Sequence, residues 1–76
     1  MSAVASLGLV KRSVSIRGHR TSVALEQAFW ERLARLAAQR GLSVSAAIAE
    51  IDAARGEANL SSAIRVAVLE AGDAAP

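Results

Sequence analysis

The sequence predicts a mainly helical chain with one β-ribbon, in which the ribbon is completed only in an obligate homodimer. Residues 20–25 alternate polar and apolar side chains, as a strand buried on one face does. From residue 27 onward, apolar residues recur every three to four positions, which is the helical period. The chain has 76 residues and no cysteine, so disulfides cannot stabilise its small core. Small chains of this kind commonly complete their core by oligomerising.

The strand over about residues 20–25 needs a partner for its backbone N–H and C=O groups. Two copies can supply it by pairing their strands antiparallel about a two-fold axis, which gives an intermolecular two-stranded sheet. Residues 13–16 also alternate polar and apolar side chains. The sequence leaves open whether residues 11–16 form a separate strand or extend the central one. The side of the strand that faces away from the core carries Arg20, Ser22 and Ala24.

Three helices are predicted after the strand, over about residues 27–39, 43–54 and 59–71. Gly41 supplies a left-handed stop after the first helix. Ser43 is the natural N-cap of the second, and Asn59 can cap the third, which ends before Gly72. The domain therefore spans residues 11–71, between a flexible N-terminal arm (1–10) and a frayed tail (72–76).

Charge is distributed unevenly along the chain. Residues 1–40 carry seven Lys or Arg against two Glu, whereas residues 41–76 carry two Arg against five acidic residues. This asymmetry indicates a basic arm that meets a polyanion, together with a separate acidic end. The alternative interpretation is a solvated basic segment that keeps a small hydrophobic dimer soluble.

Several classes of function find no support in the sequence. No apolar run approaches the roughly 18–20 residues of a membrane span, so we expect no membrane partner and a cytoplasmic location. His19 is the single histidine and cysteine is absent, so we expect no metal site. No nucleophile–base pair and no Gly-rich phosphate loop is present, so neither an enzyme nor a cofactor is expected.

Three segments resemble the ribbon-helix-helix (Arc/methionine-repressor-like) family, in the same order and spacing over about residues 20–54. They are RTSVAL at 20–25, FWERL at 29–33 and GLSVS at 41–45. More narrowly, the chain looks like a small bacterial subfamily with an additional C-terminal helix. That likeness reaches from about residue 11 to 69 and is carried by KRSVSI at 11–16, GH at 18–19, EID at 50–52 and NLSSA at 59–63.

The resemblance implies a homodimer that lays its ribbon in the major groove of double-stranded DNA, whose base edges outward side chains can read. Arg20 would make a bidentate contact to guanine, Ser22 would donate or accept, and Ala24 would touch a thymine methyl group. The expected phosphate contacts are the basic side chains Lys11, Arg12 and Arg17 and the start of the second helix at Ser43, Val44 and Ser45.

The function expected from this family is a DNA-binding transcription regulator, a repressor of nearby genes. One alternative is a protein-interaction module that engages a partner through the third helix, as antitoxins of the family do. Another is a dimer that responds to a small ligand through residues 52–62. The candidate ligand or partner residues there, which could equally be helix caps and ion pairs, are Asp52, Arg55, Asn59, Ser61 and Ser62.

Overall fold

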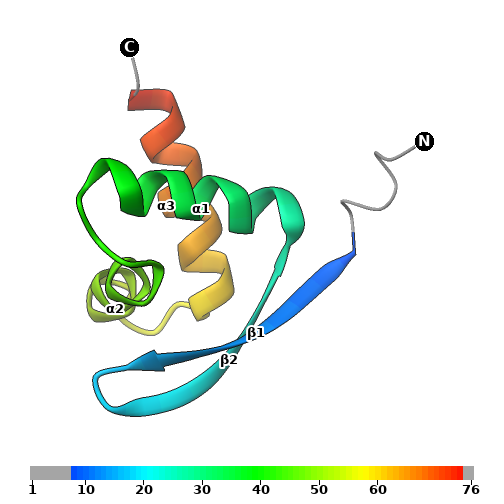
Figure 1. Cartoon of the computed structure of the whole chain (residues 1–76), viewed down its shortest axis with the longest axis vertical. Helices are drawn as coiled ribbons and strands as arrows, with labels where there is room; N and C mark the ends of the chain where they lie inside the picture. Colours follow the sequence, from blue (N-terminus) through cyan, green and yellow to red (C-terminus); the bar gives the residue numbers. More distant parts are fainter. Residues whose placement is uncertain (1–7, 75–76) are drawn as a thin grey trace.

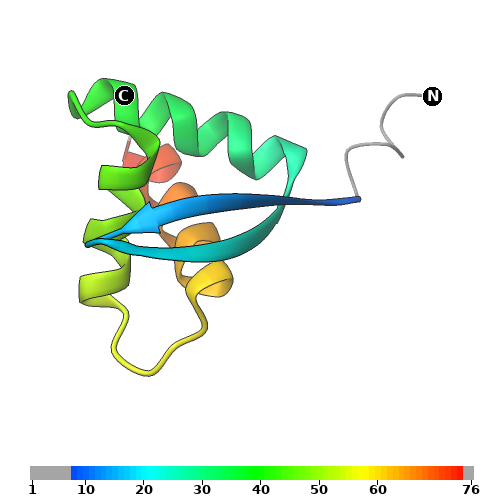
Figure 2. The same cartoon turned by 60° about the horizontal axis from the view of Figure 1, so that its bottom comes forward.

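The computed structural model describes residues 8–74 as a β-hairpin followed by three helices. The elements are β1 (Leu9–Ile16), β2 (His19–Glu26), α1 (Gln27–Gln39), α2 (Val44–Ala54) and α3 (Leu60–Ala74). The hairpin runs along one side of the helices, as Figure 1 shows, and Figure 2 shows it crossing them as a separate layer.

The two strands are antiparallel and pair from Leu9 opposite Glu26 to Ile16 opposite His19. A two-residue loop connects them, and both of its residues have positive φ, 49° at Arg17 and 84° at Gly18. Two residues with φ above zero are typical of the tight turn whose twist matches that of hairpin strands. The chain therefore closes its own ribbon.

The sheet contains a strand that the sequence left undecided. The sequence predicts that the strand around Val23 pairs with the same strand of a second copy, which would use one edge of that strand; in the structure of the single chain, its other edge pairs along its whole length with β1. The turn at Arg17 and Gly18 places β1 there, because it returns the chain directly beside itself. Residues 11–16 thus belong to a separate strand, and β1 begins at Leu9, inside the predicted arm. Residues 1–7 of that arm lie outside the described residues.

The hydrophobic core lies between one face of the hairpin and the three helices. Each helix contributes one completely buried aliphatic side chain, Leu33 from α1, Ile48 from α2 and Ile64 from α3. The hairpin contributes four residues, and the complete set is Val14, Ile16, Val23, Leu25, Trp30, Leu33, Ala37, Ala47, Ile48, Ile64 and Val68. One chain therefore covers one face of its sheet and leaves the other to solvent.

Side-chain hydrogen bonds cap the starts of α2 and α3. The Ser43 hydroxyl accepts from the Ala46 N–H at 3.0 Å, and the Asn59 side-chain oxygen accepts from the Ser62 N–H at 3.1 Å. These side chains satisfy N–H groups that a first helical turn leaves unpaired. Gly41 has φ +70°, the left-handed conformation expected of a residue after a helix.

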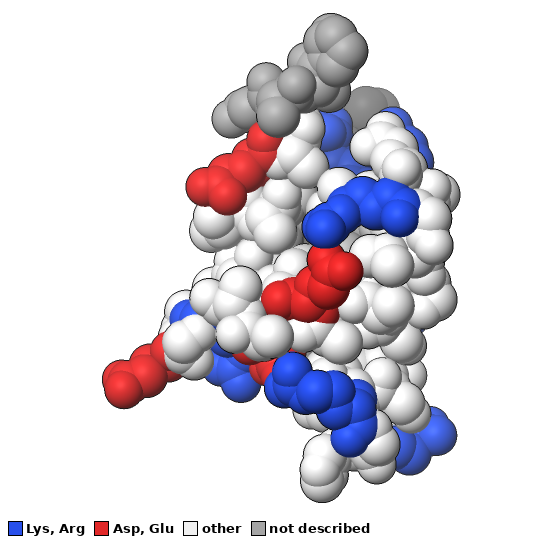
Figure 3. Space-filling view, turned by 90° about the vertical axis from the view of Figure 1, so that its left-hand side faces the viewer, with Lys and Arg blue, Asp and Glu red and all other residues white. Residues whose placement is uncertain are grey.

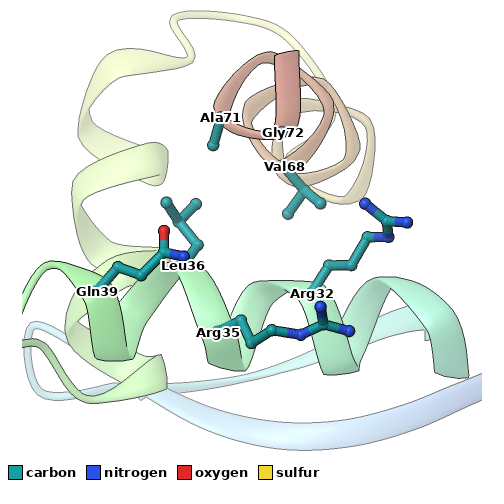
Figure 4. Close-up of a pocket in the computed structure, with 7 residues that line it drawn as sticks. All are labelled: Arg32, Arg35, Leu36, Gln39, Val68, Ala71 and Gly72. Atoms are coloured by element: carbon teal, nitrogen blue, oxygen red, sulfur yellow. The ribbon is translucent and has the colours of Figure 1, made fainter. Parts of the chain in front are cut away.

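The third helix is longer than the sequence predicts. It continues through Gly72 to Ala74, so the first residues of the predicted frayed tail are helical. Glycine weakens a helix interior by roughly 1 kcal/mol but does not end it when packing is retained. That packing comes from Val68 and Ala71, which lie one turn and one residue before Gly72 and are turned toward α1 (Figure 4). Residues 75–76 lie outside the described residues.

Candidate nucleic-acid interface

The solvent-facing side of the hairpin combines alternate residues of both strands. Four opposite pairs share this side, Leu9 with Glu26 at its end, then Lys11 with Ala24, Ser13 with Ser22, and Ser15 with Arg20. Glu26 is paired with Arg65 of α3. The residues of the three pairs that follow it are exposed except Ala24, which is half-buried. We call this surface, formed by Lys11, Ser13, Ser15, Arg20, Ser22 and Ala24, the outer face. It holds two cations, three hydroxyl groups and no carboxylate.

Arg20 is held along the outer face by a neighbour on the other strand. Its Nη2 donates to the hydroxyl of Ser13 at 3.1 Å. The contact joins β2 to β1 diagonally, and it leaves the other guanidinium N–H groups for an external acceptor. A planar guanidinium with several donors in fixed geometry is suited to bidentate recognition of a base edge or a phosphate.

The outer face contains two residues that the sequence reasoning did not assign to it. Ser13 and Ser15 belong to β1 and stand beside Ser22 and Arg20. Their alternation with Val14 and Ile16 was the signal that could have placed them. The alternation shows which side of β1 they occupy, but it places them beside Ser22 and Arg20 only once the two-residue turn brings β1 next to β2.

Arg12 lies on the opposite side of β1 from Lys11. Its guanidinium stacks over the Trp30 ring with 5.0 Å to the centroid, and the Trp30 Nε1 donates to the Val10 carbonyl at 2.8 Å. The start of β1 is thereby fixed to α1. Of these two neighbouring cations, both of which the sequence assigns to phosphate contacts, Lys11 lies on the outer face and Arg12 packs toward the helices.

The hairpin tip is attached to the end of α2 through Asp52. Arg17 Nη2 donates to one carboxylate oxygen at 2.5 Å, and Arg55 Nε donates to the other at 2.6 Å. The hydrogen bond from Arg55 is the main cause that lowers the pKa of Asp52, and Arg17 adds to it. A hollow of about 190 Å³ lies beside this cluster, between the turn, α2 and Leu60.

The candidate ligand residues around the α2–α3 turn make contacts within the chain. Asp52 and Arg55 form the ion pair, Arg55 also donates to the Ala58 carbonyl at 2.5 Å, and Asn59 caps α3 through the Ser62 N–H. The Ser61 hydroxyl donates to the carbonyl of Ala24 on β2 at 3.1 Å. Asp52 and Ser61 therefore position the hairpin against the helices, whereas the contacts of Arg55 with Ala58 and of Asn59 with Ser62 stabilise the α2–α3 turn.

The start of α2 offers backbone N–H groups to an anion. Ser43 uses its hydroxyl on Ala46, and its carbonyl accepts from Ala47 N–H at 3.0 Å. The N–H groups of Val44 and Ser45, in the first turn, have no intrahelical partner. Together with the positive end of the helix dipole, this is an arrangement that can hold a phosphate.

Charges on the face with α2 and the hairpin tip are mixed in sign. Figure 3 shows Lys and Arg side chains beside Asp and Glu on that face. The ion pairs made by α2 include Arg17 with Asp52, and Arg40 with Glu50, in which Arg40 Nη2 lies 2.7 Å from Glu50 Oε1. The outer face, in contrast, has cations without a carboxylate.

A second ion pair joins the end of β2 to α3. Arg65 donates to both oxygens of Glu26, at 3.0 Å from Nε and 3.3 Å from Nη2, and its guanidinium lies 5.7 Å from the centroid of Phe29. The hydrogen bond from Arg65 is the main cause that lowers the pKa of Glu26. Glu26 thus continues the side of the outer face at the end of the hairpin, opposite Leu9, with its charge paired to Arg65.

Comparison with known families decides the fold assignment. The family model described as "Ribbon-helix-helix domain" matches residues 9–71, which cover the hairpin, α1, α2 and most of α3. The chain belongs to the ribbon-helix-helix family. Members of this family generally form dimers that bind DNA, and they are typically not enzymes.

A solved structure supports the ribbon-helix-helix assignment. The chain is similar to an uncharacterized protein from Bordetella pertussis Tohama I, with 38% sequence identity and a TM-score of 0.74. The likeness covers 87% of this chain and 57% of that one, so the chain spans little more than half the length of this relative. No curated protein matches the chain. Within residues 8–74, no helix has the length and apolar character needed to cross a membrane.

Proposed function

We propose that this chain is a DNA-binding transcription regulator that acts as a repressor and inserts its β1–β2 hairpin into the major groove. The observation that carries the proposal is the outer face, which presents Lys11, Arg20 and three serine hydroxyls without a carboxylate. Arg20 serves as the base-reading side chain, and Ser13, Ser15 and Ser22 offer adaptable donors and acceptors. Lys11 and the start of α2 contact phosphates, which fix orientation without reading sequence.

The dimensions of the hairpin support this mode of binding. Two strands about 4.8 Å apart fit a major groove about 12 Å wide, which admits a two-stranded ribbon. Four strands, from two hairpins joined edge to edge, would span about 14 Å between the outer backbones alone. In the homodimer that we propose, each copy therefore brings its own ribbon to its own half-site.

Salt dependence of DNA binding tests the proposal. Fluorescence anisotropy with a labelled duplex from the promoter of the protein's own gene should show affinity falling by orders of magnitude between about 50 and 200 mM salt. Arg20→Ala should weaken binding to the preferred duplex by about 1–3 kcal/mol and relax sequence preference. Arg35→Ala removes the same charge from a side of α1 away from the outer face, and it should bind as the wild type does. If Arg20→Ala and Arg35→Ala lose the same amount of DNA affinity, the loss reflects net charge and not a contact of Arg20 with a base.

One observation favours the alternative of a protein-interaction module. Val66 and Leu69 on α3 are 52% and 55% exposed and lie one turn apart on the same side of the helix. A protein partner could cover them. If the purified chain binds no duplex at about 50 mM salt, where phosphate contacts are strong, and forms a stoichiometric complex that Leu69→Glu abolishes, the interaction module replaces the regulator.

A further inference from the structure

A hollow between α1 and α3 lies outside the proposed DNA-binding surface. Its volume is about 220 Å³, and it is lined by Arg32, Arg35, Leu36, Gln39, Val68, Ala71 and Gly72. Figure 4 shows the α1 side chains along one wall and the α3 side chains along the other. We call it the α1–α3 hollow.

The two walls of the α1–α3 hollow differ in chemistry. Three of the four α1 residues, Arg32, Arg35 and Gln39, carry side-chain N–H donors, with Leu36 between them. The α3 wall has only apolar side chains, Val68 and Ala71, and the bare backbone of Gly72. Such a cavity suits a molecule that is charged at one side and apolar at the other.

The positive charge of the hollow comes from Arg32 and Arg35. Among the side chains of residues 8–72, neither Arg32 nor Arg35 forms an ion pair, whereas Arg17, Arg40, Arg55 and Arg65 each have a carboxylate. The Arg32 guanidinium reaches α3 beside Gly72, with its Nη1 3.8 Å from where a Cβ of this residue would stand, which is an ordinary contact distance. Two guanidiniums one turn apart on a helix can hold one carboxylate from two directions.

We propose that the α1–α3 hollow binds a small organic anion with an apolar body. The carboxylate lies between Arg32 and Arg35, and the apolar body lies against Leu36 and Val68. The volume is below the roughly 300–1,000 Å³ of pockets for drug-sized ligands, so the ligand is a small one. A short-chain carboxylate satisfies both walls, because inorganic anions leave the apolar wall bare and neutral alcohols leave the guanidiniums unpaired.

The site is separate from the DNA-binding surface. Arg32, Arg35 and Gln39 are exposed on α1, whereas Leu36 and Val68 connect the hollow to the core. The outer face lies on the far side of the hairpin from these helices. Anion binding in the hollow is therefore independent of DNA binding by the hairpin.

Titration with hexanoate, followed by methyl and amide NMR, tests the site. Shifts should saturate at Leu36, Val68 and Ala71. Acetate, which lacks the apolar body, and hexanol, which lacks the charge, should bind at least about tenfold more weakly. Arg32→Gln and Arg35→Gln should each weaken hexanoate binding by about tenfold, the loss of one charge-assisted hydrogen-bonding group.

Two further variants separate binding from folding and from net charge. Ala71→Leu fills the hollow without removing a charge or a helix former, and it should abolish the hexanoate shifts. Arg40→Gln removes the same charge from an arginine that points to Glu50, and it should leave hexanoate binding unchanged. The proposal is overturned if acetate and hexanoate bind alike, if Arg40→Gln weakens binding as much as Arg35→Gln, or if Ala71→Leu still binds.

Discussion

Arg17 at the tip of the hairpin and Asp52 near the end of α2 are joined by an ion pair across 35 residues of sequence. The same carboxylate accepts from Arg55, so one acidic side chain connects the turn, α2 and the segment before α3. The ribbon is consequently fixed at its tip as well as at its base, where Trp30 holds the Val10 carbonyl. A ribbon fixed at both ends presents its outer face in one orientation, which lowers the entropy cost of binding a rigid groove.

The conformation of the turn gives the first prediction. Gly18 has φ +84°, and a residue with a Cβ in the left-handed region costs roughly 1–2 kcal/mol. Gly18→Ala should therefore lower the free energy of unfolding by about that amount in a urea titration. Nothing lies within 4 Å of the added Cβ, so the cost comes from backbone conformation and not from a clash. Ser15→Ala, a change on the exposed side of β1, is the control. If Gly18→Ala leaves the free energy of unfolding unchanged, the loop adopts another conformation in solution.

The parts of the fold that depend on local patterns could be predicted from the sequence. The strand around Val23, the helix periods and the caps at Ser43 and Asn59 each depend on neighbours a few residues away. The pairing of β1 with β2 could not be derived, because Arg17-Gly18 lacks the Asn-Gly or Asp-Gly signature of a two-residue hairpin loop. Arginine with positive φ is uncommon, so residue type gave no reason to place a tight turn there.

The candidate site was predictable on β2 and incomplete on β1. Arg20 and Ser22 follow from alternation alone, whereas Ser13 and Ser15 join the outer face only through the pairing of the two strands. The contacts that position the ribbon, such as the Ser61 hydroxyl on the Ala24 carbonyl, connect residues 37 apart in sequence. No local period encodes such contacts, since they depend on how α3 returns to the sheet.

The second prediction separates two neighbouring cations on β1. Lys11 lies on the outer face, whereas Arg12 stacks on Trp30 on the other side of the strand. Lys11→Ala should therefore weaken DNA binding uniformly across sequences and reduce the slope of log affinity against log salt by about 1. Arg12→Ala should weaken DNA binding less than Lys11→Ala does. It should instead lower the free energy of unfolding by about 0.5–1 kcal/mol and shift the fluorescence emission of the single tryptophan. A larger DNA effect for Arg12→Ala than for Lys11→Ala would contradict the assignment.

The third prediction concerns the core that the three helices share. Leu33 has no exposed surface, and Leu33→Ala should cost about 2–5 kcal/mol in the free energy of unfolding, since it removes buried methyl groups and leaves a cavity. Ile48→Ala should behave in the same way. Leu69→Ala is the matched control, because the same side chain type is 55% exposed on α3. Urea unfolding at several protein concentrations checks the result and also measures how far folding is coupled to dimerisation. If Leu33→Ala and Leu69→Ala lower the free energy of unfolding equally, the side chain of Leu69 is covered in solution.

The fourth prediction is an acid-dependent loss of stability from Glu26. The hydrogen bond from Arg65 lowers the pKa of Glu26 below its usual value of 4.5, so this carboxylate binds a proton more readily in the unfolded chain than in the folded one. The contribution of the ionised Glu26 to the free energy of unfolding is therefore complete above pH 4.5, and it is lost as the pH falls through the pKa of Glu26 in the folded state. Urea midpoints measured from about pH 7 to about pH 3 should show Glu26→Gln less stable than the wild type at neutral pH, with the difference narrowing in acid. Glu57→Gln removes a carboxylate that forms no ion pair among the described side chains, and it should show no such narrowing. A constant difference between Glu26→Gln and the wild type across this range would mean that the Arg65 pair does not persist in solution.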